Sequence, residues 1–86
     1  MSYISLTGRY VKSPCGGNTY LSATVYVDKR QAHHKYLNVG VYTKNEIYNE
    51  IMNLKRKYNV DEIIMVKQRK PNPTIEFVQP YIDLFI

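Results

Sequence analysis

The chain contains a single cysteine, Cys15, and no tryptophan. One cysteine excludes an intramolecular disulfide framework and a zinc site built from cysteines, and it fits a reducing compartment. The two histidines, His33 and His34, are adjacent, so in a strand they would point to opposite faces and could not chelate one metal ion together. The sequence therefore predicts neither a metal site nor a cofactor.

The sequence also lacks the organised groups on which enzymes depend. The pair Gly16–Gly17 has no Lys-Ser or Lys-Thr after it, so it is not a phosphate-binding loop. The carboxylates are scattered over the ends of predicted elements, whereas a divalent cation would need them clustered, and no nucleophile elbow is present. Metal-free RNA cleavage through His33 or His34 is the one catalytic alternative. We predict that the protein is not an enzyme.

No run of apolar residues approaches the ~18 that would indicate a membrane helix. The N-terminus also lacks the basic and then apolar pattern of a signal peptide. We therefore predict no membrane association and a cytoplasmic location. A high content of Tyr, Ile, Lys and Asn without Trp is typical of AT-rich genomes, and it favours a viral or mobile-element source, in which case the location would be the host cytoplasm.

The length and charge of the chain limit its function further. The 86 residues suffice for one small domain, 1–86, with one modest core. There are 12 Lys and Arg against 7 Asp and Glu, a formal net charge of +5, and the pI is about 9.4. Residues 1–60 hold nine basic and three acidic side chains, 9 − 3 = +6. This balance favours a polyanionic partner, although lysines scattered for solubility would give the same total.

Three segments in the first half alternate between aliphatic and polar side chains, and they predict antiparallel strands over 3–11, 20–27 and 35–42. One parity is aliphatic, with Leu21, Ala23, Val25, Val27, Leu37, Val39 and Val41 expected in the core. The outer face would carry Tyr3, Ser5, Thr7, Arg9, Tyr20, Ser22, Thr24, Tyr26, His34, Tyr36, Asn38 and Tyr42. Turn formers over 13–18 predict a hairpin loop longer than the tightest kind, and 29–34 is expected as a polar turn.

A helix is expected after these strands, because Thr43 and Glu46 have the spacing of a capping box. Apolar residues then recur at helical spacing and form a stripe that could cover the aliphatic face of the sheet. The stripe consists of Ile47, Ile51, Leu54 and Tyr58. Asn59 is suited to a left-handed C-cap.

Two further strands are expected after the helix. Residues 62–68 include four consecutive apolar side chains, the pattern of a strand covered on both sides, and we expect this strand in the middle of the sheet. Residues 74–79 alternate weakly around Ile75, Phe77 and Val78 until Pro80 ends the strand. The sequence thus predicts an α+β fold, an antiparallel sheet in the order βββαββ with one amphipathic helix packed on one face.

The last six residues, 81–86, are too apolar for a free chain end. Either they pack back on the domain, or they bury themselves against a second copy of the chain. In the second case the homodimer would form through Tyr81, Leu84, Phe85 and Ile86.

A flat face of tyrosines, hydroxyls and an arginine on a basic domain favours nucleic-acid binding. Cations would anchor phosphates, and tyrosine rings would contact bases or sugars. The predicted binding residues are Arg9, Lys12, Tyr20, Ser22, Thr24, Tyr26, Lys29, Arg30, Lys35 and Tyr36. The sequence leaves open whether the partner is a duplex or a single strand.

Two other interpretations use the same tyrosines. They could be ordinary cross-strand packing residues. They could also form the contact surface of a viral-type inhibitor that binds a host protein, because tyrosine is enriched in protein interfaces. We predict a non-enzymatic nucleic-acid-binding protein, with DNA favoured over RNA, acting as a regulator or accessory factor of a virus or mobile element.

Residues 8–58 resemble the AP2-like, arm-site DNA-binding domain of phage and transposon integrases. The resemblance lies in Gly8–Tyr10, in 20–26, and in 36–43 leading into a capped helix that ends at Tyr58. It implies three antiparallel strands backed by one helix, with the sheet entering the major groove of duplex DNA. The readers it implies are Arg9, Tyr20, Ser22, Thr24, Tyr26 and Tyr36. The final ~28 residues would be an addition that the family does not explain.

Overall fold

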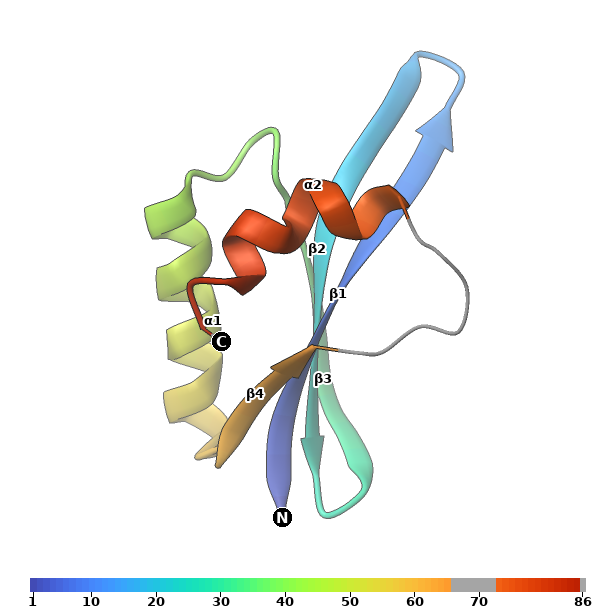
Figure 1. Ribbon diagram of the computed structural model, residues 1–86. Coiled ribbons are helices and arrows are strands. Elements are labelled where there is room, and N and C mark those ends of the chain that lie inside the picture. Colours follow the sequence, from blue (N-terminus) through green and yellow to red (C-terminus); the bar gives the residue numbers. More distant parts are fainter. Residues whose placement is uncertain (66–72, 86) are drawn as a thin grey trace.

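Residues 1–65 and 73–85, which the computed structural model describes, form a four-stranded mixed sheet with two helices on one face (Figure 1). In chain order the elements are β1 (Ser2–Ser13), β2 (Gly16–Val27), β3 (Arg30–Asn38), α1 (Lys44–Tyr58), β4 (Glu62–Met65) and α2 (Pro73–Ile82). The strands lie side by side in the order β3-β2-β1-β4. The α+β class is confirmed. Of the predicted antiparallel sheet in βββαββ order, the antiparallel pairing holds for β1–β3, whereas β4 pairs in parallel and a helix stands in place of the last strand. No helix within these ranges is long and apolar enough to cross a membrane.

β1 and β2 form an antiparallel hairpin that is paired from Ser2↔Val27 to Ser13↔Gly16. Its loop consists only of Pro14 and Cys15, and the hydroxyl of Ser13 donates a hydrogen bond of 2.6 Å to the carbonyl oxygen of Gly16. Gly16 has a φ of 130°, a conformation that glycine adopts without steric cost. The chain therefore reverses at once, and the longer loop expected over 13–18 is wrong.

β2 and β3 are joined by an equally short loop, Asp28–Lys29. Both residues have positive φ, 51° and 69°, as in a type I′ turn, whose twist matches that of the flanking strands. Pairing resumes at Arg30, where the sequence predicted a polar turn over 29–34. That turn is wrong, because Arg30, Gln31, His33 and His34 already pair with β2, with a register shift at Ala32.

The aliphatic face of the sheet forms the core, as predicted. The strands contribute Ile4, Leu6, Leu21, Ala23, Val25 and Leu37 to it, all fully buried. α1 covers them with Ile47, Ile51 and Leu54. The strand predicted over 35–42 extends too far, because β3 ends at Asn38. Val41 is consequently exposed, and Tyr42 packs against the core instead of lying on the outer face.

α1 begins and ends as its sequence predicts. The hydroxyl of Thr43 accepts a hydrogen bond from the backbone N–H of Glu46, and the Glu46 carboxylate accepts one from the Thr43 backbone. This reciprocal capping box satisfies two N–H groups that the first turn leaves without partners. Asn59 closes the helix in the left-handed conformation, at φ 52° and ψ 50°.

β4 lies at the edge of the described sheet and pairs with β1 in parallel, from Tyr3↔Glu62 to Leu6↔Met65. The prediction of an antiparallel strand in the middle of the sheet is wrong. α1 carries the chain from the end of β3 back to the opposite edge, and a crossover helix of this kind joins strands that run in the same direction. Of the predicted strand 62–68, residues 66–68 lie outside the described residues.

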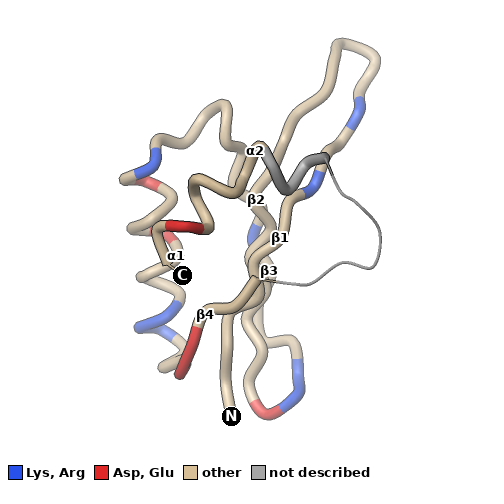
Figure 2. The backbone as a smooth tube through the Cα atoms, viewed as in Figure 1, with Lys and Arg blue, Asp and Glu red and all other residues tan. Residues whose placement is uncertain are grey.

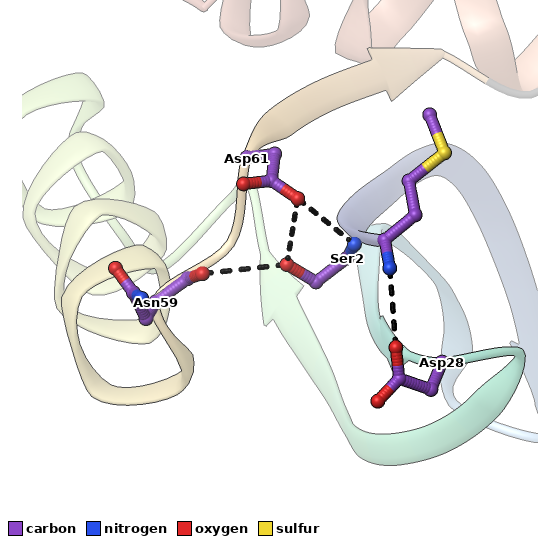
Figure 3. A network of polar contacts seen from close by, with 5 residues as sticks. Ser2, Asp28, Asn59 and Asp61 are labelled. Atoms are coloured by element: carbon purple, nitrogen blue, oxygen red, sulfur yellow. Dashed lines mark hydrogen bonds and ion pairs between the residues drawn. The ribbon is translucent and has the colours of Figure 1, made fainter.

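A polar junction fixes β1 against the start of β4 (Figure 3). The backbone N–H of Ser2 donates to Asp61 Oδ2 at 3.1 Å, and the Asp61 N–H donates to the Ser2 carbonyl oxygen at 3.1 Å. The Ser2 hydroxyl lies 3.3 Å from both Asp61 Oδ2 and the Asn59 carbonyl oxygen. The end of α1 and the beginning of β4 are thereby tied to the first residues of the sheet.

α2 replaces the strand predicted over 74–79, and Pro80 lies inside the helix instead of ending a strand. Among the described side chains of α2, Val78 and Ile82, one helical turn apart, are buried in the core. Phe85 follows at the next helical interval and packs against the same core. The weak alternation of the segment was therefore misleading, because the spacing that decides its structure is helical.

The C-terminal residues pack back on the domain as far as the structure describes them. Tyr81 is half-buried against the core, and its hydroxyl donates to the Val39 carbonyl oxygen at 3.4 Å. The Phe85 ring stacks on Tyr48 of α1, with the ring centroids 5.4 Å apart. Leu84 remains exposed, and Ile86 lies outside the described residues. The homodimer through this segment stays a prediction.

The orientation of α2 is testable by comparing two alanine variants in one helix. Ile82→Ala should lower the free energy of unfolding by about 2–5 kcal/mol, because the side chain is 1% exposed and its loss leaves a cavity. Phe77→Ala removes a larger side chain that is 67% exposed, and it should change stability by less than about 0.5 kcal/mol. Urea denaturation measures both. A larger loss for Phe77→Ala would contradict this packing.

Candidate nucleic-acid interface

The polar side chains of β1, β2 and β3 share the face of the sheet opposite both described helices, and we call it the tyrosine face. Directly paired residues of antiparallel strands lie on one face, so the register places these side chains together. The tyrosine face includes Tyr3, Ser5, Thr7, Arg9 and Val11 from β1, Asn18, Tyr20, Ser22, Thr24 and Tyr26 from β2, and Gln31, His34, Tyr36 and Asn38 from β3. The predicted separation of β1–β3 into an aliphatic and a polar face is confirmed.

Aromatic rings gather at the two ends of the tyrosine face. At the end near the β2–β3 turn, Tyr3 stacks on Tyr26 with ring centroids 5.0 Å apart and planes inclined by 25°. At the other end, Tyr36 meets Tyr20 edge-on, with centroids 6.1 Å apart and planes inclined by 71°. The His34 ring lies 4.4 Å from that of Tyr36. The face therefore presents two aromatic clusters instead of a uniform layer.

Small hydroxyl side chains lie between the two clusters, and two of them are already bound. His34 Nε2 is 3.0 Å from the Ser22 hydroxyl oxygen, and His34 Nδ1 is 3.2 Å from that of Thr24. A neutral imidazole has one donor and one acceptor nitrogen, and hydroxyls supply the complementary partners for both. Ser5 and Ser22 are buried. The sequence placed His34 on this face but gave no sign that it would hold these hydroxyls.

A pocket of about 340 Å³ opens beside the second cluster, and it is lined by Arg9, Val11, Tyr20 and Tyr36. The guanidinium carbon of Arg9 lies 5.6 Å from the centroid of the Tyr36 ring, the range of a cation–π contact. The pocket thus combines one fixed positive charge with two aromatic rings. Sequence reasoning missed Val11, although its parity along β1 is the same as that of Arg9.

The other predicted cations lie away from the tyrosine face. Lys12 has the opposite parity in β1, Arg30 is turned to the other face by the register shift between Val25 and Tyr26, and Lys29 is in the β2–β3 turn. Lys35 is on the helix-covered side, where its ammonium group forms an ion pair with Glu50 of α1. Figure 2 shows basic residues along the β1–β2 hairpin, at the turn and on α1, in separate places. Of the ten predicted residues, the structure brings together Arg9, Tyr20, Ser22, Thr24, Tyr26 and Tyr36.

The end of the β1–β2 hairpin projects past β3 as a two-stranded arm (Figure 1). Strand pairing between β2 and β3 ends at Tyr20↔Asn38, and every residue from 9 to 18 is exposed. Tyr10 lies across Gly17, so closely that a side chain at Gly17 would overlap the tyrosine ring. The glycine therefore provides room for the ring, and the arm carries Arg9 and the pocket at its base.

Among residues 1–65 and 73–85, no three His, Cys, Asp or Glu side chains are grouped as a metal site would require. Cys15 is exposed at the tip of the arm. His33 lies on the face opposite to His34 and stacks on Tyr58, with ring centroids 5.9 Å apart. The two histidines therefore do not converge, as their adjacency in a strand predicts.

No protein-family model matches this chain, and searches of curated proteins and of solved structures returned no match. The resemblance to integrase arm-site domains therefore stays a prediction. The candidate interface rests on the chain's own geometry.

The role of His34 can be tested with a matched pair of histidine variants. His34→Phe keeps an aromatic ring but removes both ring nitrogens that face the hydroxyls of Ser22 and Thr24. Because Ser22 is 4% exposed, we expect the free energy of unfolding to fall by about 1–3 kcal/mol in urea denaturation. His33→Phe retains its stack on Tyr58 and should change stability by less than about 0.5 kcal/mol. Equal losses would argue against a special role for His34.

Proposed function

We propose that this protein binds nucleic acid through the tyrosine face, as a non-enzymatic regulator or accessory factor of a virus or mobile element. DNA is favoured over RNA, because the resemblance to integrase arm-site domains points to DNA. The protein acts in the cytoplasm, which is the host cytoplasm if it is viral. It uses no cofactor and does not bind membranes.

The observation that carries the proposal is the position of Arg9 beside Tyr20 and Tyr36. The guanidinium is held next to two rings around an open pocket. Nucleic-acid-binding surfaces combine these two elements, a cation for the phosphate and an aromatic face for the base. Tyr36 is 44% exposed, so a ligand can reach its ring.

The distribution of charge supports the same partner. The net charge of +5 draws polyanions towards the molecule. Arg9 stands beside one aromatic cluster, and Lys29 in the β2–β3 turn lies beyond the other. A nucleic-acid backbone that crosses the tyrosine face lengthwise passes basic groups at both ends.

A protein partner is the second candidate. It is favoured because hydroxyls of the tyrosine face are already hydrogen-bonded within the protein. The hydroxyls of Ser22 and Thr24 contact His34, and Lys35 is paired with Glu50. Fewer polar groups are therefore available to bind a phosphate or a base than the sequence indicates. Half-exposed tyrosines on a rigid sheet are also typical of protein-binding surfaces. An inhibitor of a host factor would use the same face.

Salt dependence separates the two candidates and tests the role of Arg9. The purified protein is titrated into fluorescent duplex DNA, single-stranded DNA and RNA at two salt concentrations. Arg9→Ala should weaken binding and reduce the slope of log K against log salt by about 0.7–0.9, because one phosphate contact is lost. Arg56→Ala is the matched control, since Arg56 is an exposed arginine on α1, behind the sheet.

Equal slopes for the two variants would contradict phosphate binding by Arg9. If no nucleic acid binds even at low salt, the proposal fails. Salt-tolerant capture of one host protein by the wild type, lost in Tyr36→Ala, would then support the inhibitor.

We further propose that the chain forms a homodimer through its C-terminal segment, in which Leu84 is 41% exposed. Light scattering of the wild type should give twice the mass of one chain, 2 × 10.1 = 20.2 kDa. Leu84→Glu should give the monomer mass, because it places a charge in an apolar contact. Val41→Glu changes an exposed residue of the loop before α1 and should leave the mass unchanged. A monomeric wild type would refute the dimer.

A further inference from the structure

The hydroxyls of Ser22 and Thr24, in the middle of the tyrosine face, are already engaged, whereas the rings of Tyr20 and Tyr36 line an open pocket. Ser5 and Ser22 are buried, and the hydroxyls of Ser22 and Thr24 lie against His34. Reading a duplex groove requires free donors and acceptors that meet the edges of stacked bases. Stacking requires an exposed π face and tolerates any base. Tyr20 and Tyr36 meet the requirement for stacking.

The pocket at the base of the arm has the composition of a site for one unpaired base. Tyr20 and Tyr36 meet edge-on instead of stacking face to face, so their mutual contact covers the face of at most one of the two rings. Val11 adds an apolar wall, and Arg9 stands at the rim. Its volume of about 340 Å³ lies at the small end of ligand pockets. In a duplex, each base is covered by its neighbours and cannot enter such a pocket.

We infer that the nucleic acid is single-stranded and that one of its bases lies in the pocket against Tyr36 and Tyr20, with the adjoining phosphate on Arg9. This inference rests on the proposed function and specifies its ligand. Charge complementarity identifies the occupant, because the cation on this face is the arginine of the pocket itself. An uncharged ligand would leave the exposed Arg9 guanidinium with its contact to the Tyr36 ring but without an anion.

The second aromatic cluster, Tyr3 and Tyr26, indicates the path that the nucleic-acid strand follows across the tyrosine face. Tyr26 lies 26 − 20 = 6 residues from Tyr20 along β2, which corresponds to about 20 Å. Tyr3 and Tyr26 are stacked on each other, so this pair offers its outer ring surface and no pocket between the rings. The single-stranded nucleic acid therefore inserts a base into the pocket at the Tyr36 end of the face and lies over the rings at the Tyr3 end. Lys29 lies just beyond, at the tip of the turn.

The test compares strand forms and tyrosine variants by fluorescence anisotropy. The probes are an oligodeoxyuridylate and an oligouridylate of about 12 nucleotides, within the range of site sizes for small single-strand-binding domains, and a DNA duplex of equal length. The wild type should bind the single strands at least about tenfold more tightly than the duplex at the same salt concentration, since one stacked base contributes that much. Comparing the two single strands shows whether the 2′-hydroxyl matters.

Three variants connect this preference to the pocket. Tyr36→Leu should weaken single-strand binding by about 5- to 150-fold, because the stacking ring is lost. Tyr36→Phe retains the ring and should stay within about twofold of the wild type. Tyr48→Leu is the matched control, because Tyr48 is 42% exposed, nearly as much as Tyr36, but lies on α1. Thermal unfolding checks that each variant is folded. If Tyr36→Leu does not fold, Tyr20→Leu takes its place in the comparison.

The failure of this inference differs from the failure of the proposed function. Duplex binding as tight as single-strand binding, unaffected by Tyr36→Leu, would overturn the inference and leave nucleic-acid binding intact. The arm would then be the element that meets the duplex, and Lys12→Ala would weaken binding. Absence of binding to all three probes at low salt would overturn both.

Discussion

The ladder between β1 and β2 is the constraint on which the other parts of the structure depend. It runs without interruption from Ser2↔Val27 to Ser13↔Gly16. A slip of one residue in one strand would exchange its buried and exposed side chains, so Ile4 and Leu6 could not share a face with Leu21 and Ala23. The register thus fixes the core that α1 and α2 cover. It also fixes the tyrosine face, because the two faces are the two parities of the same strands.

The tyrosine face owes its chemistry to cross-strand neighbours. Tyr36 in β3 stands beside His34, which occupies the hydroxyls of β2, and it faces Arg9 of β1 across Tyr20. Three strands therefore build one cluster, and each ring is oriented by its neighbours. A surface of this kind loses little side-chain entropy when it meets a ligand, because the rotamers are already restricted.

Local signals in the sequence sufficed for part of this arrangement. The two faces follow from alternation within each strand, and the limits of α1 follow from Thr43, Glu46 and Asn59, whose side chains and conformations act on neighbouring backbone. The direction of β4 depends on where α1 returns the chain, which no local pattern records. α2 was mistaken for a strand, because a weak alternation concealed the helical spacing of Val78 and Ile82. Lys35 seemed a free cation because Glu50 is distant in sequence and meets it only after α1 has packed.

Because β4 pairs with β1 in parallel, the two outer strands of the sheet, β3 and β4, join it at different stages of folding. β1, β2 and β3 are joined by two-residue loops, so their contacts form between near neighbours and at small entropic cost. Tyr3 meets Glu62 only when most of the chain has been ordered. Until then the side of β1 that β4 covers is an open edge, and open edges attract other strands. The Ser2–Asp61 junction is therefore also a protection against misassembly, because closing it brings β4 over the part of the β1 edge, Tyr3 to Leu6, on which a second, partly folded chain could pair.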